Sequence, residues 1–511
     1  MSRGMVYLIG AGPGDPKLVT ARGLECLRLA DVVLYDSDVN PRLLREARSD
    51  AELIDVGGSS PKAMAQEAIS YLIIEKAREG KIVARLKVGD PFIFDRGGEE
   101  ALFLHQHGLP MEVVPGVPIT IAVPAYAGIP VTYPGGGDAL TIIRGYDETR
   151  TAMPDVDWRA LAALEGTLIC YAGPQQFPRI IEALVANGRH SDTPAAIVEN
   201  GTLPTQTSLV GTLHELTVIL DREPRQHPGL LVVGRVVAFR EHLRWFDRRP
   251  LFGKRILITR PKQQARDFVD RVTALGAEAI EAPMIRITPA DDPAPLADAV
   301  DRAGEFDWIV FTSANAVEAF MGVLLAGDRD VRALKGPRLC AVGTATAEAL
   351  SAHGIKVELV PSEFRAEAAA EAIVKHGRIK GAKVLLPRAD IGRDALGQAL
   401  RAAGADVTEV VAYRTIVDEG QREDDPDIYK MLLERRIDVV TFTSGSAVRN
   451  FARVYGAEQA ADLLRNIPVA AIGPVTADAA TAAGFHVTIQ PATYTIAALV
   501  DAVVDHFKPS A

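Results

Sequence analysis

The sequence predicts an α/β protein of several domains. Apolar, strand-like runs alternate with helix-like segments along almost the whole chain, which is the pattern of α/β folds. The chain has 511 residues, enough for about three or four domains of roughly 100–200 residues each. Gly-rich or hydroxyl-rich motifs follow several of the strand-like runs. Open α/β sheets bind ligands beyond the carboxyl ends of their strands, so we expect the function to lie in these loops.

The composition excludes several classes of function. Lys and Arg total 56 against 66 Asp and Glu, and the net charge of −10 argues against nucleic acid or a membrane as a partner. No apolar run approaches the ~18–20 residues of a membrane span, and the first residues lack a signal-peptide pattern. Cys26, Cys170 and Cys340 are far apart, so neither disulfides nor a metal site are expected. A cytoplasmic location fits these features best.

The first elements are predicted from apolar periodicity and capping residues. The expected strands are 6–9, 31–36 and 82–86, and the expected helices are 16–30 and 62–78. Asp15 and Pro16 are typical of the N-cap and the first turn of a helix. The motifs 10–15 and 87–91 therefore follow the ends of strands.

The Gly-rich segment 10–15 differs from a dinucleotide-binding loop at its last position. Asp15 stands where that fingerprint needs Gly or Ala, and its carboxylate would lie near a pyrophosphate. Asp90 adds a second carboxylate after another strand. Two carboxylates beside a Gly-rich turn favour a cationic ligand such as the sulfonium of S-adenosylmethionine. Asp15 can equally be an ordinary helix cap.

The second half of the chain contains an internal repeat. Aromatic, Pro, Gly and basic residues cluster at 240–255 and predict a boundary, with 246–254 as a solvated linker. After it, three segments recur in the same order at offsets of 128–131 residues: 257–261 with 385–389, 311–320 with 442–451, and 342–361 with 472–491. This repetition predicts two similar α/β lobes that face a common cleft.

Hydroxyl-rich loops begin four of the expected helices in this half. The loops are 312–315, 343–346, 443–446 and 473–476. Helix N-termini with hydroxyls and free N–H groups can hold carboxylates, although each loop taken singly can be ordinary N-capping. Their repetition on two lobes favours a multiply anionic ligand.

Long segments of residues 5–245 carry a family resemblance. They include GAGPGDPKLVTARGLECLRLADVVLYD, RLKVGDPFIFDRGGEE, PAYAGIPVT and LLVVGRVVAFRE. Residues 1–245 resemble the uroporphyrinogen-III C-methyltransferases and are expected to have the two-domain tetrapyrrole methylase fold. The resemblance implies methylation of uroporphyrinogen III to precorrin-2 with S-adenosylmethionine. It also implies a homodimer formed through this half.

The same resemblance implies site residues. The implied cofactor contacts are Pro13, Gly89, Asp90, Ile93, Ala172 and Gly201. Asp36 matches the family's proton acceptor, Arg96 its substrate-side Arg, and Glu99 a candidate base. Alternatively, Asp36 is a strand-end turn residue, and Arg96 and Glu99 form an ion pair at a helix N-terminus.

The chain departs from that family at several positions. Gly58 replaces a Lys, Val88 a Gly, Pro118-Ile119 a Thr-Ser or Thr-Ala pair, and Pro134 an Arg that would bind a carboxylate. Arg144-Gly145-Tyr146 stands in place of Thr-Gly-His, Ala172 in place of a Met, and Thr207 in place of an Arg. These departures leave open a second interpretation, in which the first half is a catalytically impaired module that binds ligand or serves as a scaffold.

Residues 255–511 carry a second resemblance. Segments such as RILITRPKQQARDFVDRVTALGAEAIEAPMI, WIVFTSANAV, EVVAYRT and FTSGSAV resemble uroporphyrinogen-III synthases of the HemD-like bilobal α/β fold. The resemblance implies cyclisation of hydroxymethylbilane to uroporphyrinogen III with inversion of the last ring. It also implies one lobe from about 255–286 and 416–507, a second lobe from 287–415, and two crossing strands between them.

Tyr413 matches a family Tyr that assists loss of the hydroxyl group, although it can also be a strand residue packed where the lobes cross. The candidate substrate-binding residues are Arg260, Thr312, Ser313, Arg388, Ser444, Ser446 and Thr476. Either Arg can instead be a structural salt-bridge partner. The sequence thus favours a bifunctional enzyme over a synthase with an inactive module, and over a bilobal binding protein.

Overall fold

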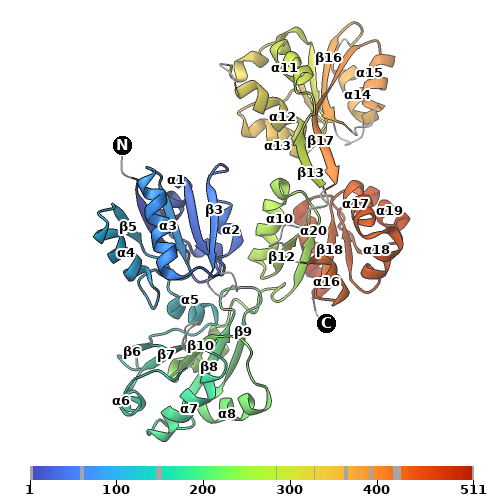
Figure 1. Ribbon diagram of the computed structural model, residues 1–511. Helices are drawn as coiled ribbons and strands as arrows, with labels where there is room; N and C mark the ends of the chain where they lie inside the picture. Colours follow the sequence, from blue (N-terminus) through green and yellow to red (C-terminus); the bar gives the residue numbers. More distant parts are fainter. Residues whose placement is uncertain are drawn as a thin grey trace. The chain divides into compact units, whose positions relative to one another are not determined.

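The computed structural model describes residues 4–57, 63–145, 152–283, 285–326, 329–361, 366–377, 379–390, 395–417 and 427–508. These residues form four five-stranded sheets with helices around them, which confirms the α/β class (Figure 1). Two sheets belong to residues 4–254, the N-terminal half, and two to residues 255–508, the C-terminal half. Contacts divide the chain into two compact units, Met1–Arg255 with Asp270–Ala279 and Phe507–Ala511, and Ile256–Val269 with Ile280–His506.

The first sheet is parallel throughout, in the order β3-β2-β4-β1-β5. Its strands are β1 (Val6–Gly10), β2 (Val32–Asp36), β3 (Glu52–Gly57), β4 (Val83–Lys87) and β5 (Met111–Val114). Its helices are η1 (Pro16–Leu18), α1 (Ala21–Leu29), α2 (Pro41–Leu44), α3 (Gln66–Arg78) and α4 (Gly97–Gln106). Val6 and Leu8 enter one buried cluster and Ile9 the other, as the two-residue period of a strand requires. The three strands predicted from the sequence are confirmed to within one residue at each end.

The helix predicted over residues 16–30 is broken near its start. Asp15 caps only the turn η1, where it accepts a hydrogen bond from the Lys17 N–H at 2.9 Å. Val19 is extended, and Thr20 then caps α1 by accepting from the Gly23 N–H at 3.1 Å. The prediction is wrong because Thr20 satisfies an N-terminal donor of a new helix. Helix α3 likewise begins at Gln66, later than predicted.

The second sheet is mixed, in the order β6-β7-β10-β8-β9. Its strands are β6 (Leu140–Arg144), β7 (Thr167–Ala172), β8 (Pro194–Glu199), β9 (Thr207–Thr212) and β10 (Gly229–Val233). The helices of this part are α5 (Ile119–Tyr126), α6 (Trp158–Ala163), α7 (Gln176–Ala186), α8 (Leu213–Arg222), η2 (Arg235–Phe239) and α9 (Arg240–Leu243). Strand β10 runs antiparallel to both of its neighbours. Val123 of α5 packs with Ile169 and Val232 of this sheet.

Residues 246–254, predicted as a solvated linker, are packed. Phe246 and Leu251 are 2% and 0% exposed. The Phe246 ring lies 4.8 Å from that of Tyr126, and the Leu251 N–H donates to the Leu275 carbonyl at 2.9 Å. Phe246 and Leu251 are thus buried among basic residues, which corrects the prediction of a solvated linker.

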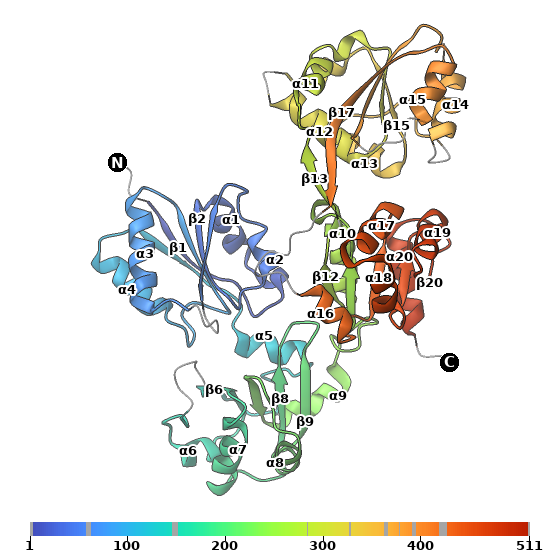
Figure 2. The same cartoon turned by 45° about the vertical axis from the view of Figure 1, so that its right-hand side comes forward.

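The C-terminal half contains two sheets with the same internal order. One is β12-β11-β18-β19-β20 and the other is β13-β17-β16-β14-β15. Their strands are β11 (Arg255–Ile258), β12 (Glu278–Glu281), β13 (Ile285–Pro289), β14 (Trp308–Phe311), β15 (Arg338–Ala341), β16 (Lys383–Ala389), β17 (Asp406–Val417), β18 (Val439–Phe442), β19 (Val469–Ala471) and β20 (Val487–Ile489). The repeated segments occupy equivalent places, since β11, β18 and β19 correspond to β16, β14 and β15. Strand β13 pairs antiparallel with the last part of β17, residues 413–417 (Figure 2).

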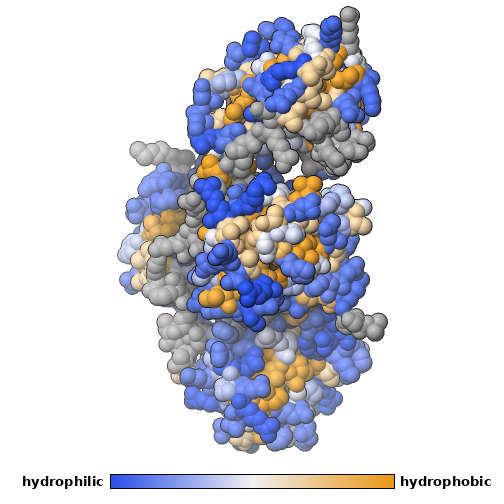
Figure 3. Space-filling view, turned by 90° about the vertical axis from the view of Figure 1, so that its right-hand side faces the viewer, coloured by the Kyte–Doolittle hydropathy of each residue, from blue (hydrophilic) through white to orange (hydrophobic). Residues whose placement is uncertain are grey.

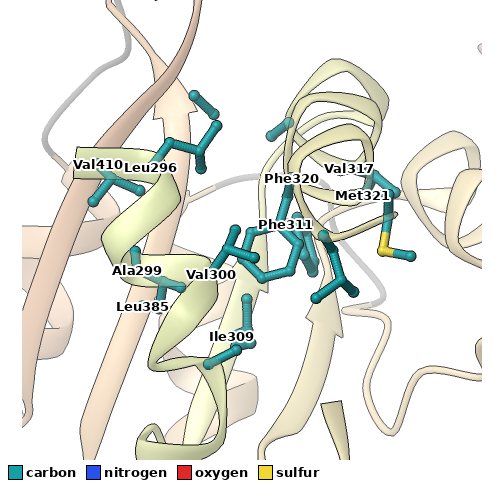
Figure 4. Close-up of a cluster of buried hydrophobic side chains, with 14 of the residues drawn as sticks. Leu296, Ala299, Val300, Ile309, Phe311, Val317, Phe320, Met321, Leu385 and Val410 are labelled. Atoms are coloured by element: carbon teal, nitrogen blue, oxygen red, sulfur yellow. The ribbon is translucent and has the colours of Figure 1, made fainter. Parts of the chain in front are cut away.

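The helices of this half complete two α/β layers. They are α10 (Lys262–Ala274), α11 (Ala294–Asp301), η3 (Ala303–Glu305), α12 (Ala314–Leu325), η4 (Val331–Leu334), α13 (Thr344–Ala352), α14 (Ala366–His376), α15 (Ala395–Ala402), α16 (Ile428–Leu433), α17 (Gly445–Tyr455), α18 (Ala457–Leu464), α19 (Pro474–Ala482) and α20 (Ile496–Phe507). In one core, Val300 of α11 and Phe320 of α12 pack over Ile309 and Phe311 of β14 (Figure 4). Burying one such side chain contributes about 1.5–3 kcal/mol.

The surface carries interspersed polar and apolar residues on the face shown in Figure 3. Cys26, Cys170 and Cys340 are buried and free. Burial raises the pKa of Cys170 and of Cys340 to about 12, so both thiols are protonated at neutral pH. Within the described residues, no helix has the length and apolar character that crossing a membrane requires.

Candidate functional site

Three loops in backbone contact form the carboxyl edge of the first sheet. They follow β1, β4 and β5, whose ends meet because these strands are parallel. Gly12 and Gly89 exchange backbone hydrogen bonds, at 3.2 Å from the Gly12 N–H and 2.8 Å from the Gly89 N–H. A Cβ on Gly116 would lie 2.0 Å from the Gly89 carbonyl oxygen, so this approach requires glycine.

Asp90 connects two of these loops through its carboxylate. Oδ1 accepts from the Phe92 N–H at 2.8 Å, and Oδ2 accepts from the Gly116 N–H at 3.0 Å. Hydrogen bonds from an N–H to a charged carboxylate are stronger than neutral ones. Asp90 therefore holds this edge of the sheet in a defined shape.

Asp15 is engaged within the protein. In addition to capping η1, it accepts from the Tyr126 hydroxyl at 2.9 Å, and its N–H donates to Thr202 Oγ1 at 3.1 Å. These contacts favour the capping interpretation over a ligand contact. They also bring the loop of Pro13 beside that of Gly201. A Cβ added at Gly201 would lie 2.3 Å from Val123 Cγ2.

A cavity of about 800 Å³ lies at this edge. It brings together six of the predicted site residues: Asp36, Gly89, Asp90, Ile93, Arg96 and Glu99. Its wall also includes Gln66, Arg85, Lys87, Asp95, Arg144 and Tyr171. Pro13, Ala172 and Gly201 are not among the described residues of this wall, and Ala172 is fully buried. Gly58 lies outside the described residues.

Buried charges form one connected network at the wall of the cavity. Arg85 Nη2 lies 2.5 Å from Asp36 Oδ1, and Arg85 Nε lies 3.2 Å from Glu100 Oε1. Lys87 Nζ lies 3.3 Å from the same Glu100 oxygen and 3.1 Å from Asp95 Oδ1. Arg85, Lys87 and Glu100 are each at most 2% exposed. Buried charges persist only when paired, and each of these three has a partner of opposite sign.

The network acts differently on its two most buried carboxyls. Burial raises the pKa of Asp36, and the nearby Arg85 and Lys87 offset this only in part. Burial also acts to raise the pKa of Glu100, but Arg85 and Lys87 outweigh it, so that pKa is lowered. Glu100 is therefore a fixed negative charge, whereas Asp36 binds a proton more readily than an ordinary Asp.

Arg96 and Glu99 form an ion pair at the start of α4. Arg96 Nη2 lies 2.7 Å from Glu99 Oε2, and both side chains are more than half exposed. This geometry agrees with the interpretation as a helix N-terminal ion pair, and both residues still line the cavity. An exposed pair of this kind contributes at most about 1 kcal/mol to stability, so it can be opened by a charged ligand at little cost.

Sequence reasoning missed Arg85, Lys87 and Glu100. Arg85 and Lys87 occupy alternate positions of a buried parallel strand, so both point to one face of the sheet. Two cations at such positions are a signal for buried carboxylates nearby. This pattern is visible in the sequence. Glu100, the partner of both cations, lies in a helix and cannot be identified from spacing.

In the C-terminal half, Ser313 and Tyr413 are hydrogen-bonded. Ser313 Oγ lies 3.1 Å from the Tyr413 hydroxyl and also accepts from the Ala316 N–H at 3.2 Å, which caps α12. Tyr413 is 8% exposed in the core of its sheet. Thr312, next to Ser313, is exposed at the end of β14.

The equivalent loop of the other sheet repeats this capping. Ser444 Oγ accepts from the Ala447 N–H at 3.2 Å and lies 3.0 Å from Ser446 Oγ. Ser313 and Ser444 have nearly the same backbone angles, with φ of −157° and −158°. Thr476, in the first turn of α19, is 5% exposed.

The two predicted arginines already have partners in the protein. Arg388 Nη1 lies 2.8 Å from Glu409 Oε2, and Arg401 binds the other oxygen of that carboxylate at 2.8 Å. Arg260 Nε donates to Gln264 Oε1 at 3.4 Å, and burial lowers the pKa of Arg260. These contacts agree with structural roles, and substrate binding by either residue stays a prediction.

Comparison with known proteins accounts for both halves. The model of the tetrapyrrole (corrin/porphyrin) methylases matches residues 5–217, and the model of uroporphyrinogen-III synthase HemD matches residues 266–501. A porphyrin biosynthesis protein HemD of Ruminiclostridium josui is 35% identical over 482 residues, which is 94% of each chain. The chain belongs to the family in which these two enzymes are fused.

Other relatives match the methylase half. The uroporphyrinogen-III C-methyltransferase of Bacillus subtilis is 36% identical over 65% of this chain and 68% of its own. A crystal structure of the uroporphyrin-III C-methyltransferase of Thermus thermophilus, complexed with S-adenyl homocysteine, is 37% identical. It covers 46% of this chain and 99% of its own, with a TM-score of 0.40.

Proposed function

We propose that this chain catalyses two consecutive steps of tetrapyrrole biosynthesis. Its synthase half cyclises hydroxymethylbilane to uroporphyrinogen III, and its methylase half methylates uroporphyrinogen III to precorrin-2. The observation that carries this proposal is the similarity over 94% of the chain to one relative, HemD of R. josui, because it spans both halves. A cytoplasmic location and a homodimer formed through the methylase half are part of the proposal.

The methylase site fits S-adenosylmethionine and a tetrapyrrole. The cavity of about 800 Å³ lies within the size range of small-molecule sites, roughly 300–1,000 Å³. Glycines at the close loop contacts let the backbones of these loops approach one another at its edge. S-adenosylmethionine supplies an electrophilic methyl group. Gly89, Asp90 and Ile93 would hold it, and Asp36 would accept the proton that the macrocycle loses after a pyrrole carbon is methylated.

The alternative of an impaired methylase module has less support. Among the departures on which it rests, Pro134, Ala172 and Thr207 are not among the described residues that line the cavity, whereas Val88, Pro118, Ile119 and Arg144 line it. Thr207 donates to Glu199 Oε2 at 3.1 Å, an interaction of the second sheet. The residues that line the cavity include the charged groups that proton transfer needs.

In the synthase half, the chain supplies positioning and one proton donor. Loss of hydroxide from hydroxymethylbilane leaves a cation that closes the ring after the last pyrrole inverts. Ser313 Oγ already accepts from an N–H, so its own hydrogen can be donated to Tyr413. The Tyr413 hydrogen is then available for the departing hydroxyl group. Thr312, Ser444, Ser446, Thr476, Arg260 and Arg388 are proposed to bind substrate carboxylates.

Asp90→Ala tests the cofactor site. The change removes the hydrogen bond from the Gly116 N–H, which joins the Asp90 loop to its neighbour, and the bond from the Phe92 N–H within the Asp90 loop. Each such bond to a charged group contributes about 1.5–3 kcal/mol. We expect the affinity for S-adenosylmethionine, measured by calorimetry, to fall at least about tenfold. Formation of uroporphyrinogen III by the same chain should be unchanged. Undiminished affinity would contradict the assignment of Asp90.

A further inference from the structure

The charged network at the cavity contains one member outside the cavity wall. Asp36, Arg85, Lys87 and Asp95 line the cavity, whereas Glu100 does not. Glu100 is 1% exposed and lies in the first turn of α4, where the helix dipole favours a negative charge. The proposed chemistry uses Asp36, but it assigns nothing to Glu100.

Three donors converge on a single oxygen of Glu100. Arg85 Nε, Lys87 Nζ and Gln66 Nε2 lie 3.2, 3.3 and 2.8 Å from Oε1. The other oxygen, Oε2, is buried and has no hydrogen-bond partner among the described residues. One carboxylate oxygen thus anchors both buried cations.

Arg85 is shared between two carboxylates. Its Nη2 binds Asp36 and its Nε binds Glu100, so the negative charge of Glu100 partly neutralises the guanidinium that Asp36 faces. Several other charged groups surround Asp36. They are Lys87 on β4, Asp38 after β2, and Asp95, Arg96 and Glu99 before and at the start of α4, all of which line the same cavity. Of these, Lys87 is also held by Glu100.

We propose that Glu100 is a positioning residue for methyl transfer, which sets through Arg85 and Lys87 how strongly Asp36 holds a proton. The proposal rests on the proposed role of Asp36 as proton acceptor. With Glu100 charged, the two cations are partly neutralised, and Asp36 keeps a higher proton affinity. Without that charge, both cations act on Asp36 more strongly and its proton affinity falls.

Two substitutions in the full chain should shift the pH profile in opposite directions. Glu100→Gln keeps an acceptor at Oε1 and places its amide nitrogen where the unpartnered oxygen lies. We expect the acid limb of methyl transfer to uroporphyrinogen III to move down by about one pH unit, a tenfold change in proton affinity. Arg85→Met removes the cation from Asp36 and should move the limb up. If Arg85→Met does not fold, Arg85→Lys should give the same direction with a smaller shift.

A matched control separates charge from packing. Glu112→Gln neutralises a carboxylate of β5 in the same sheet, which pairs with Arg22 at 2.7 Å and does not line the cavity. Its pH profile should equal that of the wild type. Loss of rate without opposite shifts in the Glu100 and Arg85 variants would show a merely structural role and overturn the proposal.

A second measurement tests the role of Glu100 separately from the proposed role of Asp36 as proton acceptor. The carboxyl of Asp36 can be titrated by ¹³C NMR in the substrate-free protein, with its signal identified by its loss in Asp36→Asn. Opposite shifts of this titration in the two variants support the network. If Asp36→Asn also retained activity, only the role of Asp36 as proton acceptor would be rejected. An Asp36 titration that neither variant moves overturns the inference.

Discussion

Asp36→Asn is expected to lower the rate of methyl transfer by about 10²–10⁴-fold, the usual contribution of a general base. Asn keeps the size of Asp and can still accept a hydrogen bond from Arg85, whose Nη2 lies 2.5 Å from the carboxylate. It cannot accept the proton that the methylated macrocycle loses. The measurement is the initial rate of methylation of supplied uroporphyrinogen III.

The fused chain contains its own control for this variant. Formation of uroporphyrinogen III by the synthase half should be unaffected, and calorimetry should show unchanged binding of S-adenosylmethionine. Asp55→Asn is a matched variant. Asp55 lies on the neighbouring strand β3, and its carboxylate accepts a hydrogen bond from the Ser37 hydroxyl at 2.9 Å. A methylation rate in Asp36→Asn within about threefold of the Asp55→Asn rate would reject Asp36 as the base.

The pH dependence of the wild type follows from the same residue. Burial raises the pKa of Asp36, so the ionised, proton-accepting form appears at a higher pH than in an ordinary Asp. Methyl transfer should therefore be lost as the pH falls through this raised pKa. The direction is that of a base that must be deprotonated before it acts.

Tyr413→Phe is expected to slow the formation of uroporphyrinogen III by about 10²-fold, because it removes the proposed proton donor for hydroxyl loss. The hydroxyl lies 3.1 Å from Ser313 Oγ, and Phe fills the same buried space without it. Products are resolved as the I and III isomers. The isomer I fraction should rise as the catalysed route slows.

Tyr429→Phe is the matched control for this second variant. The Tyr429 hydroxyl accepts from Gln459 Nε2 at 2.7 Å, so this variant also loses one hydrogen bond to a side chain. It should keep the wild-type rate and isomer ratio. Equal rates of uroporphyrinogen III formation in Tyr413→Phe and Tyr429→Phe would show that Tyr413 is not the proton donor. Methyl transfer should be normal in both variants.

The positions of strand ends and helix caps could be predicted from the sequence. Ser313 and Ser444 cap α12 and α17 as the repeated loops indicate, because a hydroxyl before an apolar helix has few other local partners. The break at Thr20 was missed, since Asp15 and Thr20 both suit an N-cap and periodicity alone does not choose between them. The burial of Phe246 could not be predicted, because the basic residues around it are typical of a solvent-exposed segment.

The sequence predicts the candidate site only where the residues of a recognisable motif line the cavity. Gly89 and Asp90 follow a strand end, and their place at the cavity follows from the parallel sheet. The network of Arg85, Lys87 and Glu100 depends on how α4 packs beside β4. Such tertiary pairing leaves no regular spacing in the sequence. Neither the partner of Arg388 nor that of Tyr413 could be predicted for the same reason.

The most direct test supplies the purified chain with hydroxymethylbilane and S-adenosylmethionine together and identifies the products over time. If the chain carries both activities, uroporphyrinogen III forms first and is then converted to its dimethylated product, precorrin-2. Omission of S-adenosylmethionine should stop the sequence at uroporphyrinogen III. Formation of isomer I alone, or of isomer III that is never methylated, would contradict a bifunctional enzyme.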